Sequence, residues 1–457
     1  MNLTLPKEVQ YIIEMLQNSK YDAYIVGGCV RDILLNTTPH DWDICTSALP
    51  NEVMHVFKNE KIIETGLKHG TVMIIKNDIP FEITTFRTES GYTDNRRPDT
   101  VNFVSNISQD LLRRDFTINA MAYNSDKGLV DLFDGQSDIK NKIIKTVGNS
   151  DTRFNEDALR ILRALRFASQ LKFNINADTS HSIHNNKQLL NNIASERIWS
   201  EFKKILTGKQ FVKILREYVD VISVFIPQIG KMKGFNQQNP YHCYDVWEHT
   251  LHALEYSPDD IIIKLAVLFH DIGKPETFSV DDNGVGHFYG HPKVSRQITE
   301  NIFIKLKVDN NTKNQVLTLV ENHDKMINAS EKSVKKSIQR LGSRKMFRNL
   351  IYVKMCDVRG QSKLISEKRI KHLEQLLKIE ERLASDNQLI LSVKELNING
   401  NDIIALGISQ GEQVGYVLKQ LLKLVMDNKI KNTHSHLVNA AKEIILNIDT
   451  MTNYVIN

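Results

Sequence analysis

The sequence predicts an α+β fold in which a small head with a mixed sheet precedes a long helical remainder. Short apolar runs typical of strands, such as Ala23–Val26 and Thr71–Lys76, are confined to residues before Gly148. From about Phe154 onward, nearly every segment has the apolar spacing of a helix. A chain of 457 residues is also too long for one hydrophobic core, so we expect several domains.

The composition is that of a globular protein in a reducing compartment. Apolar residues make up 41% and charged residues 25%, and the net charge of +5 is mild, so nucleic-acid contacts would need a local basic face. The four cysteines have no C-x-x-C spacing, which argues against disulfides or a zinc ribbon. Charges near the N-terminus argue against a signal peptide, and no apolar run is long enough to span a membrane. We therefore expect a cytoplasmic protein with no membrane contact.

The head begins with an amphipathic helix and then a glycine turn. The apolar run Ala23–Val26 stops at Gly27 and Gly28, and helical spacing resumes at Val30–Leu35. Glycines let the backbone approach phosphate oxygens, and Arg31 would add a charged donor. The turn is therefore a candidate anion site. The apolar face of the opening helix comprises Val9, Ile12, Ile13 and Leu16.

Two carboxylates follow this turn with the spacing of one strand face. Asp41 and Asp43 flank Trp42, and alternation in a strand would point both side chains into the same volume. Adjacent anions repel each other, so we expect a divalent cation between them, most plausibly Mg2+ with phosphate oxygens in its shell. Glu82 is a candidate third catalytic carboxylate, although an edge-strand glutamate facing solvent is nearly as plausible.

The rest of the head contains further strands, a loop and a helix. The polar stretch from Arg87 to Thr100 predicts a mobile loop, and Leu111–Asn124 returns to helical spacing with Arg113, Arg114 and Asp115 at its start. The strand-like runs are Lys61–Glu64, Thr71–Lys76, Pro80–Phe86 and, closing the head, Ile143–Val147.

One long helix, from about Arg153 to Phe173, opens the helical remainder. Asp157 and Arg160 are three residues apart, and Arg160, Arg163 and Arg166 repeat at that interval along one side. An exposed face with ion pairs is one interpretation. Three arginines without interleaved acids would repel each other, however. The other interpretation is therefore that a triphosphate or an RNA backbone lies across them.

These motifs together resemble a known family. In order, the chain carries G-G-C-V-R-D, D-W-D, R-R-D-F-T-I-N-A-M-A, E-D-A-L-R-I-L-R-A-L-R-F and S-E-R-I-W-S-E-F-K-K-I-L. They resemble the motifs of bacterial class II tRNA nucleotidyltransferases, the CCA-adding enzymes, which are related to poly(A) polymerases. The resemblance is dense over the first 210 residues and returns in the tail from Leu396. It implies a nucleotidyltransferase head at 1–147, a base-reading neck at 148–210, a body at 211–365 and a tRNA-binding tail at 366–457.

The resemblance also implies residue roles. Proline is usual in the family where Ala158 stands, and this position suits proline without requiring it. For the implied base-reading pair, Asp157 offers only acceptors and Arg160 only donors. Such a pair would match the hydrogen-bonding edges of cytosine and adenine and would clash with those of uracil and guanine. The implied roles are metal binding by Asp41 and Asp43, phosphate contact by Gly28 and Arg31 in the turn with Gly27, ribose contact by Arg114 and Asp115, base reading by Asp157 and Arg160, and phosphate binding by Arg163 and Arg166.

A second set of metal ligands occurs in the body. His270 and Asp271 end an apolar helical run, and a lone H-D pair or core histidine would mean little. The order H…H-D…H…H…D nevertheless resembles the HD phosphohydrolases, with Asp271 as the bridging ligand. The other four ligands are His249, His291, His323 and Asp357. Such ligation suits Mn2+, Ni2+, Fe2+ or another transition metal, and the resemblance implies phosphatase or 2′,3′-cyclic phosphodiesterase activity on RNA ends.

We predict an enzyme that adds C, C and A to tRNA from CTP and ATP without a nucleic-acid template, releasing pyrophosphate. The loop residues Asp94, Arg96 and Arg97 resemble a segment that CC-only relatives lack, which favours complete C-C-A addition. Alternatives are a poly(A) polymerase, an A-only or CC-only relative, or an HD phosphohydrolase with a nucleotide-sensing or RNA-binding head. A scaffold without catalysis explains least. Candidate RNA-contacting lysines are Lys203, Lys204, Lys209, Lys231, Lys233, Lys419, Lys423, Lys429 and Lys431.

Overall fold

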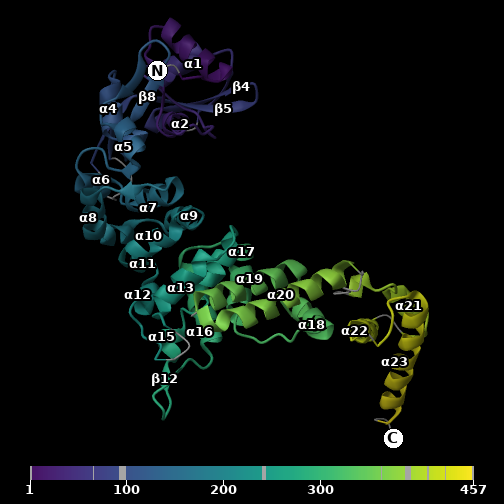
Figure 1. The fold of residues 1–457 in the computed structure, drawn as a ribbon. Coiled ribbons are helices and arrows are strands. Elements are labelled where there is room, and N and C mark those ends of the chain that lie inside the picture. Colours follow the sequence, from purple (N-terminus) through teal and green to yellow (C-terminus); the bar gives the residue numbers. More distant parts are fainter. Residues whose placement is uncertain are drawn as a thin grey trace. The chain divides into compact units, whose positions relative to one another are not determined.

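The computed structural model divides into two compact units (Figure 1). One unit comprises Met1–Lys231 with Ile302–Val308, and the other comprises Met232–Asn301 with Asp309–Asn457. The structure describes residues 3–64, 66–91, 99–238, 243–361, 363–385, 393–408, 411–427 and 429–454. Within these ranges, no helix has both the length and the apolar character needed to cross a membrane. The expected cytoplasmic location stays a prediction.

The head is built on a mixed sheet, as predicted. Its described strands follow the order β3-β4-β5-β2-β1-β8-β9. The β2–β5 pair is parallel and the other neighbours are antiparallel. The strands are β1 Ala23–Val26, β2 Asp43–Thr46, β3 Lys61–Ile63, β4 Thr71–Lys76, β5 Ile79–Thr85, β8 Met121–Asn124 and β9 Gly128–Asp131.

The centre of this sheet is covered on both faces. All four residues of β1 are buried. Tyr24 and Val26 pack in one cluster with Phe86 and Leu111, while helix α1 (Lys7–Asn18) contacts β1 and buries its predicted apolar face. Burial on both faces explains why β1 is a continuous apolar run instead of an alternating one. The remaining head helices are α2 Gly28–Leu34, α3 Pro50–Val56, η1 Leu67–His69, α4 Ile107–Leu112, η2 Thr117–Asn119 and α5 Gly135–Asn141.

Two predictions about the head were wrong in detail. The ends of the expected loop form an antiparallel hairpin of β6 (Arg87–Ser90) and β7 (Thr100–Phe103), while Asp94, Arg96 and Arg97 lie outside the described residues. The expected helix at Leu111–Asn124 ends early, and its second half is strand β8, which pairs with β1 and β9. Every residue of β8 is buried. An apolar run buried on both faces has no alternation, so its spacing could not distinguish strand from helix.

The neck is helical, but its first helix is broken. Helix α6 (Ser150–Glu156) ends before Asp157, whose extended backbone (φ −138°, ψ 102°) interrupts the expected continuous helix. The carboxylate Oδ1 of Asp157 then accepts the Leu159 amide at 3.1 Å and caps helix α7 (Leu159–Leu171). The parallel pair β10 Ile143–Ile144 and β11 Asn174–Ile175 joins the end of the head to this region. The neck continues through α8 Ala177–Asn186, η3 Lys187–Asn192 and α9 Ser195–Leu206, and the chain then runs, beyond the predicted neck limit at residue 210, through α10 Phe211–Glu217, α11 Val219–Phe225 and α12 Pro227–Met232.

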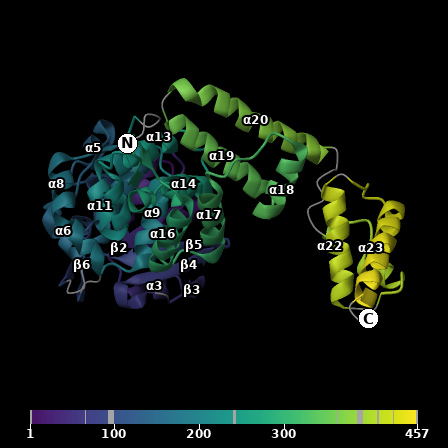
Figure 2. The same cartoon turned by 90° about the horizontal axis from the view of Figure 1, so that it is seen from below.

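The second unit is almost entirely helical. Helices α19 (Arg344–Gly360) and α20 (Lys363–Ser385) run side by side (Figures 1 and 2). In the tail, α21 (Gly400–Ile404), α22 (Glu412–Met426) and α23 (His434–Tyr454) share an apolar core of their own. The other elements are α13 Val246–Glu255, α14 Ile261–Phe269, α15 Lys274–Thr277, β12 Ser279–Val280, β13 Gly286–His287, α16 His291–Lys305, α17 Asn310–Asn322, α18 Glu331–Leu341 and η4 Val393–Glu395.

Candidate functional site

The glycine turn lies where strand β1 meets helix α2, as expected. Gly27 has φ 80°, and a β-carbon there would lie 3.0 Å from Nη1 of Arg114. Gly28 has no positive φ, and a β-carbon there would lie 3.7 Å from Nη2 of Arg31. Gly27 is therefore required both by its backbone conformation and by the close approach of Arg114. Arg31 and Arg114, two predicted nucleotide-binding residues, therefore lie against glycine backbone that carries no side chain.

The head carboxylates lie beside this turn. Asp43 is the first residue of β2 and pairs in parallel register with Glu82 of β5, whereas Asp41 lies in a bend before the strand. All three are exposed. Although Asp43 is accessible to solvent, the protein around its carboxyl group partly desolvates it and raises its pKa; Arg114 opposes that rise, and the charge of Asp41 adds to it. Asp41, Asp43 and Arg114 therefore interact electrostatically.

These carboxylates form an open group. Within the described part of the chain, the three-ligand groups whose atoms lie within 4.8 Å of one another do not include Asp41, Asp43 or Glu82. The neighbouring pair Asp41 and Asp43 fits a divalent cation in charge and in oxygen ligands, but it leaves most of the coordination shell to water or substrate.

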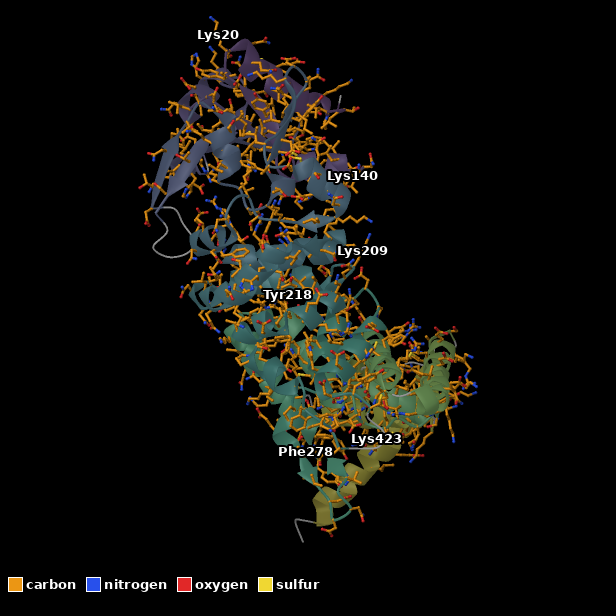
Figure 3. All side chains as sticks on the ribbon, turned by 60° about the vertical axis from the view of Figure 1, so that its left-hand side comes forward. Lys20, Lys140, Lys209, Tyr218, Phe278 and Lys423 are labelled. Carbon is orange, nitrogen blue, oxygen red and sulfur yellow. The ribbon has the colours of Figure 1, made fainter. Side chains whose placement is uncertain are left out.

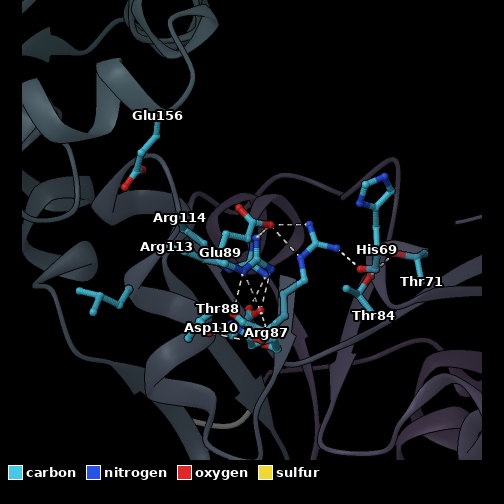
Figure 4. Close-up of polar contacts among 12 residues, drawn as sticks. His69, Thr71, Thr84, Arg87, Thr88, Glu89, Asp110, Arg113, Arg114 and Glu156 are labelled. Carbon is cyan, nitrogen blue, oxygen red and sulfur yellow. Dashed lines mark hydrogen bonds and ion pairs between the residues drawn. The ribbon is translucent and has the colours of Figure 1, made fainter. Parts of the chain in front are cut away.

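A buried acid that the sequence analysis missed holds the arginines after α4. Asp110 binds Arg113 through Oδ1 at 2.6 Å and Arg114 through Oδ2 at 3.2 Å (Figure 4). Arg113 and Arg87 also bind Glu89, at 3.2 and 2.8 Å, which ties hairpin strand β6 to α4. The i,i+3 and i,i+4 spacing of Asp110 to the two arginines was a usable signal for this contact.

The buried carboxylate of Asp115 forms an ion pair with Arg163. Its Oδ2 accepts hydrogen bonds from Arg163 Nε at 2.8 Å and Nη2 at 2.5 Å. Burial opposes ionisation, but the Arg163 guanidinium overcomes it and lowers the pKa of Asp115 to about 2. Asn119 donates to Asp115 Oδ1 at 3.2 Å and accepts from Arg31 Nη1 at 2.8 Å. Asn119 thus links two predicted site residues, although it was not predicted itself.

The arginine stripe of α7 corrects one argument from the sequence. The arginines do not lack acidic partners, because other elements supply them. Arg160 pairs with Glu156 at 2.7 Å, Arg163 with Asp115, and Arg166 with Glu201 of α9 at 3.0 Å. An anion is therefore not needed to make the stripe stable. Asp115 and Glu201 come from distant positions in the sequence, whereas the i,i+4 spacing of Glu156 to Arg160 was a usable signal.

The predicted base-reading residues sit at the break between α6 and α7. Asp157 Oδ2 lies 3.5 Å from Arg197 Nη2, and its Oδ1 caps α7. The Arg160 guanidinium donates to Glu156, to the Arg153 carbonyl at 3.2 Å and to the Arg113 carbonyl at 3.0 Å. These bonds use three of the five N–H groups of a guanidinium and fix its orientation.

In the body, all six predicted HD-site ligands converge. His249 of α13 and His270 lie near Oδ2 of Asp271, while His291 and His323 lie near its Oδ1, and Asp357 of α19 lies against His249 and His270. The Nε2 atoms of His249 and His270 lie 3.5 and 3.3 Å from Oδ2, and those of His291 and His323 lie 3.3 and 3.7 Å from Oδ1. Asp357 Oδ1 is 3.1 Å from His249 Nε2. Asp271 therefore joins two three-ligand groups, as a bridging ligand must.

Helix ends orient three of these histidines. The Nδ1 atoms of His270, His291 and His323 lie 2.6, 2.9 and 2.6 Å from the carbonyl oxygens three residues earlier. A carbonyl only accepts, so Nδ1 carries the proton and Nε2 faces the cluster. The Nε2 atoms of His291 and His323 are 3.2 Å apart. Ligand atoms on one transition metal, with bonds of about 2.1 Å, are roughly 3.0–3.4 Å apart, so the residues fit such an ion.

The charges of this cluster also favour a cation. Burial alone would lower the pKa of His270, but Asp271 and Asp357 raise it to about 10. Lys274, which the sequence analysis did not single out, lies 2.7 Å from Asp271 Oδ2, and its positive charge offsets part of the negative charge of that carboxylate. Burial, assisted by the charge of His270, lowers the pKa of His323 to about 3, so this imidazole stays neutral and able to bind metal.

A cavity of about 290 Å³ opens beside the ligands His323 and Asp357. Lys354 reaches it from α19 and donates to the His323 carbonyl, and burial lowers the pKa of Lys354 to about 8. Arg369 of α20 donates to Gln361 at 2.7 Å, and Gln361 donates to Asp357 at 3.2 Å. The other residues that line the cavity are Asp324, Lys325, Met326, Ile327, Val358, Lys368, His372, Leu373 and Leu376.

Comparison with known proteins assigns the regions that carry both sites to known domain families. Residues 23–145 match the poly A polymerase head domain, 172–228 a probable RNA- and SrmB-binding site of polymerase A, and 241–360 the HD domain. The CCA-adding enzyme of Pediococcus pentosaceus is 33% identical over 453 residues, covering 96% of this chain and 98% of that protein. The chain belongs to the CCA-adding enzyme family. The predicted fold class and family are confirmed, and the chain is a nucleotidyltransferase.

Further relatives support this assignment. The CCA-adding enzyme of Lactobacillus helveticus is 34% identical over 92% of this chain and 93% of its own. The Bacillus stearothermophilus CCA-adding enzyme, solved in complex with CTP, is 27% identical with a TM-score of 0.72 over 98% of this chain and 100% of that one. The Thermotoga maritima enzyme, solved with tRNA, shares the fold at 21% identity and a TM-score of 0.62, covering 97% of each chain.

Proposed function

We propose that this CCA-adding enzyme transfers C, C and A from CTP and ATP to the 3′ end of tRNA. The observation that carries the proposal is the grouping of Asp41, Asp43, Arg114 and the Gly27 turn, together with the contact of Arg160, beside the helix break at Asp157, with the Arg113 carbonyl. The tRNA 3′-hydroxyl attacks the α-phosphate in line, and pyrophosphate leaves. Mg2+ held by Asp41 and Asp43 would supply a lowered hydroxyl pKa and charge neutralisation.

The protein's own residues position the nucleotide. Arg31 and Arg163 are fixed by Asn119 and Asp115, so their guanidiniums are held before a triphosphate binds. Arg114 lies over the bare backbone of Gly27 and carries a positive charge beside Asp43. Glu82 pairs in register with Asp43 and is assigned as an accessory carboxylate.

Asp157 and Arg160 read the base in this proposal. The carboxylate accepts from the amino group of cytosine or adenine, and the remaining Arg160 donors reach the ring nitrogen acceptor. Uracil and guanine present the opposite pattern to both groups, and leaving buried polar groups unpaired is costly. Protein side chains thus replace a nucleic-acid template.

The test is nucleotide choice on tRNA that lacks its 3′ end, with each of the four nucleotides supplied separately. The double variant Asp157→Ala with Arg160→Ala should lose preference for C and A over U and G by about a hundredfold. Asp157→Asn is the matched variant, because its oxygen still caps α7 while its amide donates to the base. Unchanged nucleotide choice in the double variant would refute the assignment. Addition of A alone, C-C alone or many A residues by the parent would favour the corresponding relative.

We propose a second activity, hydrolysis of phosphate or 2′,3′-cyclic phosphate at RNA ends by the HD site. The convergence of four histidines on Asp271, with Asp357 against two of them and a cavity with cationic side chains beside the site, favours it. Mn2+, Ni2+, Fe2+ or a similar ion would supply an activated water and neutralise the phosphate. Lys354 and Arg369 would attract and orient the phosphate.

Cyclic phosphate hydrolysis tests this second activity. Metal-loaded parent should open adenosine 2′,3′-cyclic monophosphate, and the double variant His270→Ala with Asp271→Ala should lose at least about a hundredfold in rate. Chromatography of the nucleotide products gives the rates. Equal hydrolysis by parent and variant would show that the HD site does not carry this activity.

Binding of tRNA is proposed for the neck, body and tail. Lys209 and Lys423 are exposed and extend from the chain surface (Figure 3). The RNA role of these and the other predicted lysines and the domain limits at 147, 210 and 365 stay predictions. Binding through lysines should weaken steeply as salt concentration rises.

A further inference from the structure

Three guanidiniums gather on one aromatic ring where the neck meets the head. The Cζ atoms of Arg166, Arg31 and Arg163 lie over the Phe167 ring, at 4.3, 5.2 and 5.4 Å from its centroid. Phe167 lies on α7 and is 6% exposed. Arg31 comes from helix α2 of the head, so the ring joins residues far apart in the sequence. These three arginines are the ones assigned to the triphosphate.

Each guanidinium also has a carboxylate partner. Arg31 pairs with Asp32 at 2.6 Å, Arg163 with Asp115 at 2.5 Å and Arg166 with Glu201 at 3.0 Å. A carboxylate occupies N–H donors of its arginine, whereas an aromatic face attracts the cation through its quadrupole and occupies none. Contact with the ring therefore holds the arginines while it leaves donors for phosphate oxygens.

Repulsion among the three charges shows why such a contact is needed. Burial and the charge of Arg163 lower the pKa of Arg166 to about 10, and Arg31 adds to this effect. Each guanidinium is held by its own carboxylate, but the repulsion that remains favours their separation when no anion is bound. A ring that all three approach opposes this separation, because cation–ring attraction strengthens when solvent is excluded.

We propose that Phe167 is a positioning residue, whose ring holds Arg31, Arg163 and Arg166 as a preformed set for the triphosphate of the incoming nucleotide. The proposal rests on the proposed role of these arginines in nucleotide binding. A leucine would fill the same core position but would provide no negative ring face.

Phe116 provides a matched control. Its ring contacts Phe167 at 5.7 Å between centroids and at 81° between planes, and it is fully buried. The three guanidiniums are recorded over Phe167 and not over Phe116 among the described residues. A change in packing should affect both positions, whereas a change in ring electrostatics should affect arginine placement only at Phe167.

The experiment replaces Phe167 in the full chain with phenylalanines that carry one, two or three ring fluorines. Fluorine withdraws charge from the ring face with little change in shape, so CTP affinity should fall stepwise, by about tenfold at three fluorines. Cytidine, which lacks phosphates, should bind with unchanged affinity. The same series at Phe116 should leave CTP affinity within about twofold. Phe167→Leu and Phe116→Leu repeat the comparison with natural residues, and thermal unfolding checks that each variant folds.

The outcomes separate the two levels of the proposal. An equal effect of fluorination at both positions, an equal effect on CTP and cytidine, or no effect at Phe167 would overturn the role of the ring. Arg31→Gln and Arg163→Gln test the underlying assignment. If these variants bind CTP as the parent does, the arginines do not hold phosphates and both proposals fail. Weakened CTP binding in them, with stepwise loss at Phe167, supports both.

Discussion

In the head, Asp41 and Asp43 are exposed and have Arg114 as their charged neighbour, whereas in the body Asp271 is buried and joins four histidines and Asp357. The head has carboxylate ligands at an open position and arginines fixed around it. The body has two groups of three imidazole and carboxylate ligands that share Asp271. The same side-chain type, aspartate, is thus used in two different ways in one chain.

This difference indicates how each site acquires its cation. An open pair of carboxylates binds a hard cation weakly until substrate phosphates complete the shell. A buried shell with preset histidine tautomers binds a transition metal without substrate, because the protein supplies most of its ligands. We therefore expect exchangeable ions in the head and resident ions in the body.

The largest effect should come from replacing a metal-binding aspartate of the head with a residue that cannot bind metal. Asp43→Ala should lower CTP incorporation into tRNA lacking its 3′ end by roughly a thousandfold or more, because no other described side chain replaces a metal ligand there. It should leave cyclic phosphate hydrolysis and tRNA binding within about twofold. Incorporation assays, hydrolysis assays and gel-shift binding check this. Parallel loss of both activities would break the comparison, since it would mean that the sites are not independent.

Metal retention should show an intermediate effect. After gel filtration in buffer without added metal, the parent should keep up to two transition-metal ions per chain, in line with its two ligand groups. Asp271→Asn should lower retention by about tenfold to a hundredfold, because it removes the ligand that both groups share. Asp43→Asn is the matched control and should retain as much metal as the parent. Elemental analysis of the purified proteins measures the outcome, and equal retention by all three would contradict the difference between open and closed sites.

The smallest effect concerns the Asp115–Arg163 ion pair. The folded pKa of Asp115, about 2, lies below its ordinary value of 3.8, so this carboxylate stabilises the fold above pH 4 and loses that contribution as pH falls toward 2. Asp115→Asn should cost about 2 kcal/mol of the unfolding free energy at pH 7. Urea unfolding of parent and variant at pH 7, 5 and 3 should show the two curves converging in acid. A gap that widens with acid would have the wrong sign.

Much of this fold was predictable because its signals are local. The apolar face of α1 and the strand before Gly27 follow from spacing within short stretches, whereas the HD ligands, spread from His249 to Asp357, were predicted from a family resemblance. Strand β8 was not predictable, because Met121–Asn124 is buried on both faces and lacks alternation. The break at Asp157 was missed as well, since no glycine or proline marks it.

The candidate sites were predictable in residue identity more than in arrangement. Motifs pointed to Arg163 and Arg166, but their partners Asp115 and Glu201 are distant in sequence and only folding brings them near. Likewise, the carbonyl contacts that fix the ring of His270 depend on where helix α14 ends. Pairings of this kind are tertiary facts that no spacing rule contains.

The break at Asp157 has a consequence for redesigning nucleotide choice. One oxygen of this side chain accepts from the Leu159 amide and the other lies 3.5 Å from Arg197 Nη2, so the residue supports the start of α7 and also links it to α9. Replacements without an acceptor would loosen the helix and blur specificity at the same time. A mutant library that seeks a new substrate preference should therefore sample asparagine, serine and threonine at position 157 first. It should sample more residue types at neighbouring positions whose side chains do not support the start of α7.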